Sequence, residues 1–295
     1  MNNVIIISIL ILNLALMLAG YYAFNTYLYF SLACKRGKNN KDSKKTESGI
    51  PPIYEILQID GIPGKLQGYY LPGYSKHLVI LVHGWMDDAA SRLDDVSFYK
   101  EQGYHVFIPD LRAHGASSGK YLGMGITDSV DLVDWVRYFK DKLGSDTEII
   151  IDGVSVGAAA VLHMDANFIN QNVKAIVSDS SYEKLNLIIF KLMNISRKYK
   201  MKFNAIGINC WCRLFGKYKI KDGNVLENIK NIKIPVLIIG GDMDKIVPID
   251  AQRRLQAACG GKCTLWISQK ASHAKAAYAD RTLYNDVINQ FLKSI

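Results

Sequence analysis

Short runs of Val, Ile and Leu alternate with helix-length segments along most of this chain, and this alternation constrains the fold more than any other feature. Such runs are typical of strands buried on both faces of a parallel sheet, because helices form the connections between them. We expect eight strands, at residues 53–59, 66–71, 77–82, 104–109, 147–152, 173–178, 235–240 and 263–268. The first two are close enough in sequence to form an antiparallel hairpin. Helices are expected at residues 89–102, 127–143, 155–168, 249–259 and 279–293.

One long segment departs from this alternation. Residues 182–224 separate two predicted strands and contain no strand pattern of their own. The segment begins with the apolar stretch "LNLIIFKLMNI" and ends with an aromatic group, Trp211, Phe215 and Tyr218. We therefore predict a helical cap insertion at residues 182–224, lying over one end of the sheet.

The N-terminal region has a different composition from the rest of the chain. Residues 4–24, "VIIISILILNLALMLAGYYAF", contain no charged side chain and are long enough to cross a bilayer as a helix. Lys and Arg are absent before this run and no clear cleavage site follows it, which favours an uncleaved single-pass anchor over a signal peptide. We divide the chain into a transmembrane anchor at 1–34, a basic linker at 35–50 and a catalytic domain at 51–295.

The charge distribution supports a membrane location and leaves its side open. Of the net charge of +9, residues 1–46 carry +5, from six basic residues and Asp42. Basic charge beside an apolar segment suits a membrane surface better than a nucleic acid. The position of this cluster after the span favours the cytoplasmic face for the catalytic domain. Cys259 and Cys263 flank a Gly-Gly turn whose length permits a disulfide, which would suit an exported domain instead.

The stretch "DGVSVGAAA", residues 152–160, is the strongest chemical motif. It places Ser155 between Gly153 and Gly157, between a predicted strand and a predicted helix, where a nucleophile elbow belongs. We expect a turn so sharp that Ser155 adopts a strained backbone conformation and a side chain at either glycine would collide with a neighbouring element. The serine hydroxyl would then project from the carboxyl ends of the strands.

A serine hydroxyl needs a base that takes its proton. Of the six histidines, His273 lies in the loop after the last predicted strand and can reach Ser155, whereas His163 should point away from it. A carboxylate must hold the base, and both Asp242 and Asp244 directly follow a buried strand. We choose Asp244. No spacing of Cys and His is typical of a zinc site, and we expect neither a metal nor a cofactor.

Backbone N–H groups are needed to stabilise the charge that develops on the substrate oxygen. We expect one donor to be the Val156 N–H, at the start of the helix after the serine. The second should be the Trp85 N–H, in the loop "LVHGWMDDA" (81–89), where Gly84 allows close approach.

Five segments together resemble a known family: "LVHGWMDDA", "IPDLRAHGASSG" (108–119), "DGVSVGAAAVL" (152–162), "GGDMDKIVP" (240–248) and "ASHAKA" (271–276). They are similar to successive motifs of the α/β-hydrolase superfamily, and most similar to bacterial membrane-anchored serine hydrolases with a short helical cap. The resemblance covers residues 53–295 and implies the α/β-hydrolase fold, a mostly parallel eight-stranded sheet with helices on both faces.

The resemblance also implies roles for individual residues. Ser155 would be the nucleophile, His273 the base and Asp244 the acid, since Asp244 is the aspartate of a G-x-x-D-x-x-V-P motif. Other residues of the shared motifs would support the site, namely His83, Gly84, Gly153, Gly157, Asp110, Arg112 and His114. Val156 and Ala158 differ from the residues common in the family and would alter the pocket wall. Serine in place of aspartate at position 155 argues against the dehalogenase and epoxide-hydrolase branches.

These features predict a membrane-anchored serine hydrolase that cleaves ester, thioester or lipid-like acyl substrates through an acyl-enzyme intermediate. A serine peptidase or amidase would use the same Ser-His-Asp triad and stays open. A non-catalytic membrane-bound binding protein is disfavoured, because no member of the triad is missing. The expected partners are a small-molecule or lipid acyl substrate and the membrane, and no nucleic acid. The sequence leaves the natural substrate and the oligomeric state open.

Overall fold

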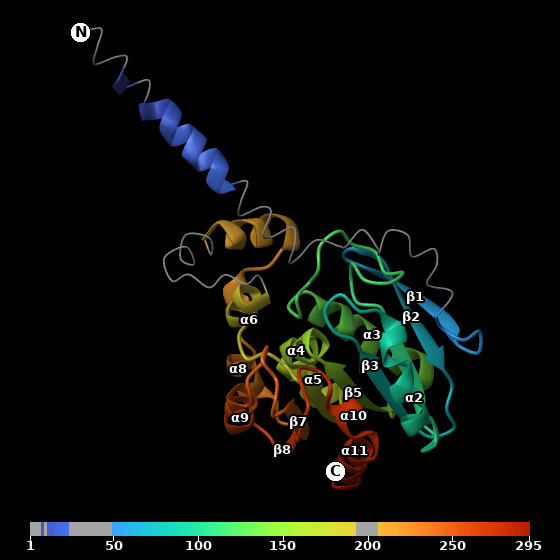
Figure 1. Cartoon of the computed structure of the whole chain (residues 1–295). Coiled ribbons are helices and arrows are strands. Elements are labelled where there is room, and N and C mark those ends of the chain that lie inside the picture. Colours follow the sequence, from blue (N-terminus) through green and yellow to red (C-terminus); the bar gives the residue numbers. More distant parts are fainter. Residues whose placement is uncertain (1–6, 9–10, 24–48, 193–205) are drawn as a thin grey trace.

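The computed structural model describes residues 7–8, 11–23, 49–192 and 206–295, and one eight-stranded sheet forms its centre (Figure 1). The strands lie in the order β1-β2-β4-β3-β5-β6-β7-β8. Only β2 runs antiparallel to its neighbours, β1 and β4, and the other pairs are parallel. Their bounds are β1 Glu55–Gly61, β2 Gly64–Leu71, β3 His77–Val82, β4 His105–Pro109, β5 Glu148–Val154, β6 Ala175–Asp179, β7 Val236–Gly241 and β8 Cys263–Ser268. The predicted strands and the predicted hairpin are confirmed, with ends shifted by at most three residues.

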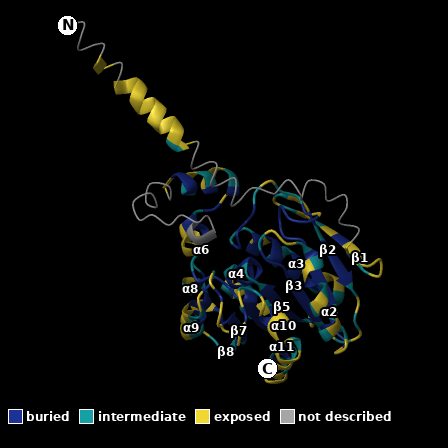
Figure 2. Cartoon of the chain, viewed as in Figure 1, coloured by how far each residue is buried: buried dark blue, intermediate teal, exposed yellow. Residues whose placement is uncertain are grey.

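Helices cover both faces of the sheet. The central strands are almost wholly buried, as expected from their Val, Ile and Leu content. One face packs against α3 (Asp128–Leu143), α4 (Val156–His163) and α9 (Ile249–Ala258), and the other against α2 (Leu93–Lys100) and α11 (Arg281–Lys293). Figure 2 shows the resulting buried centre, with exposed residues on the outer sides of the helices.

Two predicted helices are interrupted, and an aspartate side chain explains where one of them breaks. The helix predicted at 155–168 ends at His163, because Asp165 accepts the Phe168 N–H (2.9 Å) and begins α5 (Ala166–Asn172). The helix predicted at 279–293 is confirmed as α11, which Asp280 caps directly after the short α10 (Ala276–Ala279). The helix predicted at 89–102 begins as a 3₁₀ turn, η3 (Ala89–Arg92), before α2. The continuous helices predicted at 89–102 and 155–168 were wrong. A capping side chain explains the new helix start at Asp165, whereas Arg92 at the start of α2 makes no side-chain capping bond.

The segment 182–224 contains short helical elements in its described residues: α6 (Leu185–Leu192), η4 (Cys212–Gly216) and η5 (Ile220–Asp222). Leu185 and Ile188 pack into the core on the α4 side of the sheet. A bridge between Lys184 and Asn224 joins the two ends of the segment. The remaining elements are α8 (Val225–Asn228) and η6 (Ile229–Asn231), which lead into β7. The function of residues 182–224 as a cap over the site stays a prediction.

The N-terminal region contains a helix at residues 11–23 that is exposed on nearly every residue (Figure 2). Its Tyr22 hydroxyl accepts a hydrogen bond from the Gly207 N–H (2.9 Å), which links the helix to the 182–224 segment. Within the described ranges, no helix is both long enough and apolar enough to cross a membrane. The transmembrane helix predicted at 4–24 is therefore not found there, although residues 4–6, 9, 10 and 24 lie outside the described residues. Residues 35–48 of the predicted linker also lie outside them.

Candidate active site

Ser155 occupies the sharp turn between β5 and α4. Its backbone has φ 55° and ψ −114°, a conformation that L-residues other than glycine rarely adopt. The Ser155 N–H donates to the Asp179 carbonyl at the end of the neighbouring strand β6 (2.8 Å). The expected strained backbone is confirmed, and this hydrogen bond helps to hold it.

Gly153 and Gly157 are required by packing around this turn. A Cβ at Gly153 would lie 2.7 Å from the Ala158 nitrogen in α4, and one at Gly157 would lie 2.3 Å from the His83 carbonyl oxygen. Both predicted collisions are confirmed. Gly84 differs, because a Cβ there would lie 3.6 Å from the Ser155 Cβ, at ordinary contact distance. Backbone packing therefore does not demand glycine at position 84, but an added methyl group would occupy space beside Ser155.

Ser155, His273 and Asp244 form one hydrogen-bonded chain. The distance from Ser155 Oγ to His273 Nε2 is 2.8 Å, and that from His273 Nδ1 to Asp244 Oδ2 is 2.7 Å. Because a carboxylate accepts, Nδ1 carries the proton and Nε2 is left to accept from the serine hydroxyl. The N–H groups of Ile246 and Val247 donate to Asp244 Oδ1, each at 2.8 Å, and so fix the carboxylate.

The two carboxylates after β7 lie in different surroundings. The Asp244 side chain is 1% exposed, and that of His273 is 18% exposed. Asp242 is exposed instead, and its backbone N–H continues the ladder to Ser268 in β8 (3.1 Å). The geometry therefore selects Asp244 as the carboxylate that orients His273.

A cavity of about 260 Å³ opens at Ser155 and His273. Trp85 and Val156 border it, so both residues expected to provide N–H donors lie at the same hollow. Much of the remaining wall is apolar and is formed by Tyr182, Ile188, Ile246 and Val247. Tyr182 and Ile188 belong to the 182–224 segment. The Tyr182 hydroxyl donates to the Met124 carbonyl (2.6 Å), which fixes the ring in place. The cavity suits an apolar group attached to a carbonyl carbon at Ser155.

Two histidines fix the loop that carries Trp85. His83 Nδ1 donates to the Gly84 carbonyl (2.8 Å), while its Nε2 accepts the Leu111 N–H (3.0 Å). Complete burial, reinforced by the neighbouring His114, holds the pKa of His83 well below its usual range, so the ring is neutral. His114 Nε2 accepts the N–H of Met86, the residue after Trp85 (3.3 Å). Both histidines therefore position backbone beside Ser155.

The rest of the "DLRAHG" turn is also held by buried contacts. Asp110 accepts the Ala89 N–H at the start of η3 (2.9 Å), and a Cβ at Gly115 would lie 2.2 Å from the Asp110 carboxylate. Arg112 donates to both oxygens of Asp131, at 2.7 and 2.6 Å. Burial raises the pKa of Asp131 to about 6 despite this pairing. These contacts connect the turn to η3 and α3 and so brace the loops around the cavity.

Two residues at the end of β6, Asp179 and Ser180, were missed by the sequence reasoning. Ser180 Oγ donates to Asp179 Oδ1 (2.7 Å) and accepts the N–H of Ala274, the residue after His273 (3.2 Å). Ser180 and Ala274 both have positive φ, at 58° and 55°. The signal was available in "SDSS", because the carboxyl ends of neighbouring parallel strands meet at one edge of the sheet. Ser180 therefore connects the histidine loop to β6.

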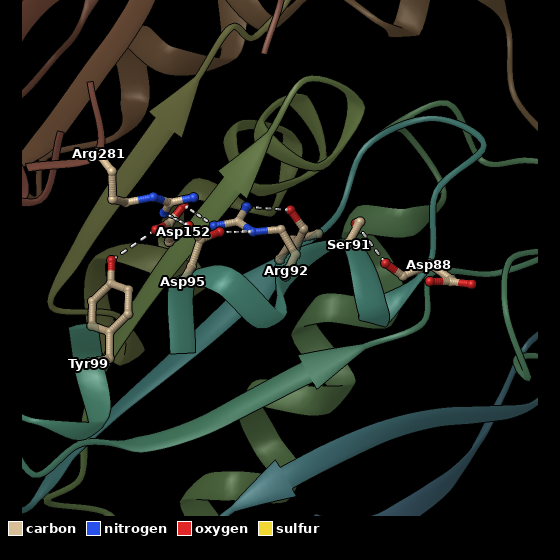
Figure 3. Close-up of polar contacts among 8 residues, drawn as sticks. Asp88, Ser91, Arg92, Asp95, Tyr99, Asp152 and Arg281 are labelled. Atoms are coloured by element: carbon tan, nitrogen blue, oxygen red, sulfur yellow. Dashed lines mark hydrogen bonds and ion pairs between the residues drawn. The ribbon is translucent and has the colours of Figure 1, made fainter. Parts of the chain in front are cut away.

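A charged network lies buried beside the turn (Figure 3). Arg92 donates through Nε to Asp95 (2.7 Å), through Nη2 to Asp152 (2.9 Å) and through Nη1 to the Val82 carbonyl (3.1 Å). The Tyr99 hydroxyl donates to the other Asp152 oxygen (2.9 Å). Since Val82 precedes the Trp85 loop and Asp152 precedes Ser155, Arg92 holds both loops to one another.

Comparisons with known proteins agree with this architecture. A family model described as the alpha/beta hydrolase fold matches residues 77–194. The uncharacterized protein YqkD of Bacillus subtilis is 25% identical over 254 residues, which cover 85% of this chain and 80% of YqkD. The human protein ABHD12B is 26% identical over 189 residues, covering 60% of this chain and 48% of ABHD12B.

Solved structures show the same fold at lower sequence identity. The Pyrococcus furiosus esterase Pf2001 superposes with a TM-score of 0.65 and 22% identity, covering 82% of this chain and 92% of the esterase. Est1E from Butyrivibrio proteoclasticus, solved with ferulic acid bound, has a TM-score of 0.64 and 19% identity, covering 81% of this chain and 98% of Est1E. The chain thus has the α/β-hydrolase fold, and the family match over residues 77–194 agrees with it.

Proposed function

We propose that this α/β-hydrolase-fold protein is a serine hydrolase in which Ser155 is the nucleophile, His273 the general base and Asp244 the residue that orients the base. The single observation that carries this proposal is the hydrogen-bonded chain through the three side chains, with distances of 2.8 and 2.7 Å. Such a chain activates a hydroxyl that is otherwise a weak nucleophile.

The reaction would proceed in two halves. His273 Nε2 takes the hydroxyl proton while Ser155 Oγ bonds to the substrate carbonyl carbon, and the Trp85 and Val156 N–H groups stabilise the oxyanion. The His273 imidazolium then gives its proton to the leaving group as the bond to it breaks. Water, deprotonated by His273, attacks the resulting acyl-enzyme and releases the acid and the free serine.

The lining of the cavity supports an acyl substrate with an apolar chain. Tyr182, Ile188 and Val247 would contact the chain, and the first two belong to the segment 182–224, which we propose as a cap over the site. Esters, thioesters and lipid-like acyl compounds fit this description, and the similarity in fold to esterases agrees with it.

The test is covalent labelling by a fluorophosphonate probe, which reacts with activated serines. We expect one adduct per chain, located by mass spectrometry of the peptide that contains Ser155. Preincubation with an excess of a hydrolysable aliphatic ester should slow the labelling, because both compounds compete for the same cavity. An adduct on a different residue of the folded protein would refute this assignment of the nucleophile.

We propose further that the N-terminal segment anchors the protein to a membrane. The support is the uncharged run at residues 4–24, the basic cluster that follows it and the exposed apolar side chains of the helix at 11–23. Leu14 and Leu18 are both 59% exposed on this helix. Lys at a position in the centre of a membrane-spanning helix costs about 3 kcal/mol.

The full-length double variant Leu14→Lys, Leu18→Lys should leave the membrane pellet under alkaline carbonate, whereas the wild-type protein should remain in it. The matched control is Tyr74→Lys, at a domain residue that is 83% exposed, and it should remain in the pellet. Release of the wild-type protein by carbonate would contradict anchoring and would leave the hydrolase proposal unaffected.

A further inference from the structure

A second, polar cavity lies beside the first. Its volume is about 150 Å³, and it lies between the η3–α2 region and the α10–α11 region. Five residues border both cavities, namely Gly84, Asp87, Val154, Ala274 and Lys275. Val154 precedes Ser155 in the chain and Ala274 follows His273. Two cavities of different polarity therefore share a wall beside Ser155 and His273. One has a largely apolar lining, and the other is lined mainly by polar and charged groups.

Most of the buried charge around the polar cavity is neutralised within the protein (Figure 3). Asp95 accepts from both Arg92 (2.7 Å) and Arg281 (2.5 Å). Asp152 accepts from Arg92 and from Tyr99, each at 2.9 Å. Arg92 donates to Asp95, Asp152 and the Val82 carbonyl, and among the described residues it forms no hydrogen bond to a further carboxylate of this network.

Asp179 is the exception. It is 2% exposed and borders the polar cavity, and Ser180 donates to one of its oxygens. Among the described residues, the Ser180 hydroxyl is the one group that hydrogen-bonds to the Asp179 carboxylate. Burial raises the pKa of Asp179 to about 6, with Asp152 acting in the same direction and Ser180, Arg92 and His273 opposing it. A buried carboxylate with an open oxygen is costly unless a ligand supplies the missing donor.

We propose that the polar cavity is a second substrate subsite, in which Asp179 accepts a hydrogen bond from a cationic N–H group carried by the leaving group. The inference rests on the proposed serine hydrolase function and specifies its substrate class: acyl esters of amino alcohols. With the acyl chain in the apolar cavity, the other substituent of the carbonyl would extend past Gly84 and Ala274 toward Asp179. Lys275 lies at the rim of the cavity, and its ammonium group contacts the Tyr278 ring, 4.2 Å from the ring centroid.

Two butyrate esters of equal shape test this proposal. 2-(Dimethylamino)ethyl butyrate carries a protonated N–H at neutral pH, and 3-methylbutyl butyrate is its uncharged counterpart. We expect the wild-type kcat/KM to favour the cationic ester by about tenfold to a hundredfold, the range typical of a hydrogen bond to a charged group. In Asp179→Asn the ratio of kcat/KM for the cationic ester to that for the neutral ester should fall to about one, even if the substitution lowers kcat/KM for both.

Two matched variants separate Asp179 from the other charges at the cavity. Asp94→Asn removes an exposed carboxylate from the rim and should keep the ratio. Lys275→Gln should keep or increase it, because a competing cation is removed. A wild-type ratio near one, a ratio that survives in Asp179→Asn, or a ratio that disappears in Lys275→Gln would each overturn the proposal.

The pH dependence of the wild-type ratio gives a test that needs no variant. Asp179 accepts as a carboxylate, so the preference should be present above its pKa and lost as the pH falls through about 6. The groups that face Asp179 are Ser180, Asp152, Arg92, His273 and Tyr284. A ratio that stays constant across this range would overturn the subsite, while fluorophosphonate labelling and cleavage of the neutral ester report separately on the serine hydrolase.

Discussion

Ser155→Ala should lower kcat for a short p-nitrophenyl ester by about four to six orders of magnitude, which is the loss typical of removing a serine nucleophile. The substitution removes the atom that bonds to the substrate and leaves His273 without the hydroxyl at 2.8 Å. The remaining N–H donors and the cavity would still bind the ester, so KM should change far less than kcat. Stopped assays with high enzyme concentration can measure such a residual rate.

The control for this variant is Ser145→Ala, an exposed serine in the turn between α3 and β5. It should retain wild-type hydrolysis and fluorophosphonate labelling, whereas Ser155→Ala should lose both. Ser155→Ala should also keep its melting temperature within a few degrees, because alanine has the same difficulty as serine in adopting φ 55°. Undiminished labelling of a folded Ser155→Ala protein would exclude Ser155 as the nucleophile.

The sheet could be predicted because its strands are specified locally. The central strands β3, β5, β6 and β7 are continuous apolar runs bounded by polar or turn-forming residues, and each was found near its predicted position. Helix boundaries depend instead on single side-chain hydrogen bonds. Asp165 and Asp280 cap new helices, and an aspartate in a helical pattern does not by itself show that it will do so.

The candidate site could be predicted in part for a topological reason. Ser155 and His273 are 118 residues apart, but each follows a strand whose carboxyl end lies at the same edge of a parallel sheet. Asp179 is the last residue of such a strand, yet its proposed role depends on which other carboxylates are paired. That pairing arises because Arg92 reaches across from η3 to Asp152, which is 60 residues later in the chain.

The N-terminal prediction has a different basis from the others. The apolar, uncharged composition of residues 4–24 favoured a membrane span. Such a composition predicts contact with lipid rather than with another part of the protein. The Tyr22 hydroxyl of the described helix at 11–23 accepts a hydrogen bond from the Gly207 N–H in the 182–224 segment. Nearly all residues of this helix are exposed, so extraction from membranes is the experiment that tests the proposed anchor.

The second large effect on kcat is expected from substitution of Asp244, and not from substitution of Asp242, the other carboxylate after β7. Asp244→Asn should lower kcat by about four orders of magnitude, while Asp242→Asn should stay within about threefold of the wild type. An amide at position 244 still accepts the N–H groups of Ile246 and Val247 through its oxygen, which directs its NH₂ group toward His273. The imidazole must then accept at Nδ1 and carry its proton on Nε2, where it cannot take the proton of Ser155.

The pH profile distinguishes this effect from simple loss of structure. A tautomer change leaves fold and cavity intact, so Asp244→Asn should melt within a few degrees of the wild type and bind substrate with a similar KM. Its rate should recover in part at high pH, where hydroxide can replace the general base. Asp242 is exposed and hydrogen bonds to β8 only through its backbone N–H, so its side chain has no such influence. If Asp242→Asn proved the more damaging change, the orientation of His273 by Asp244 would be wrong.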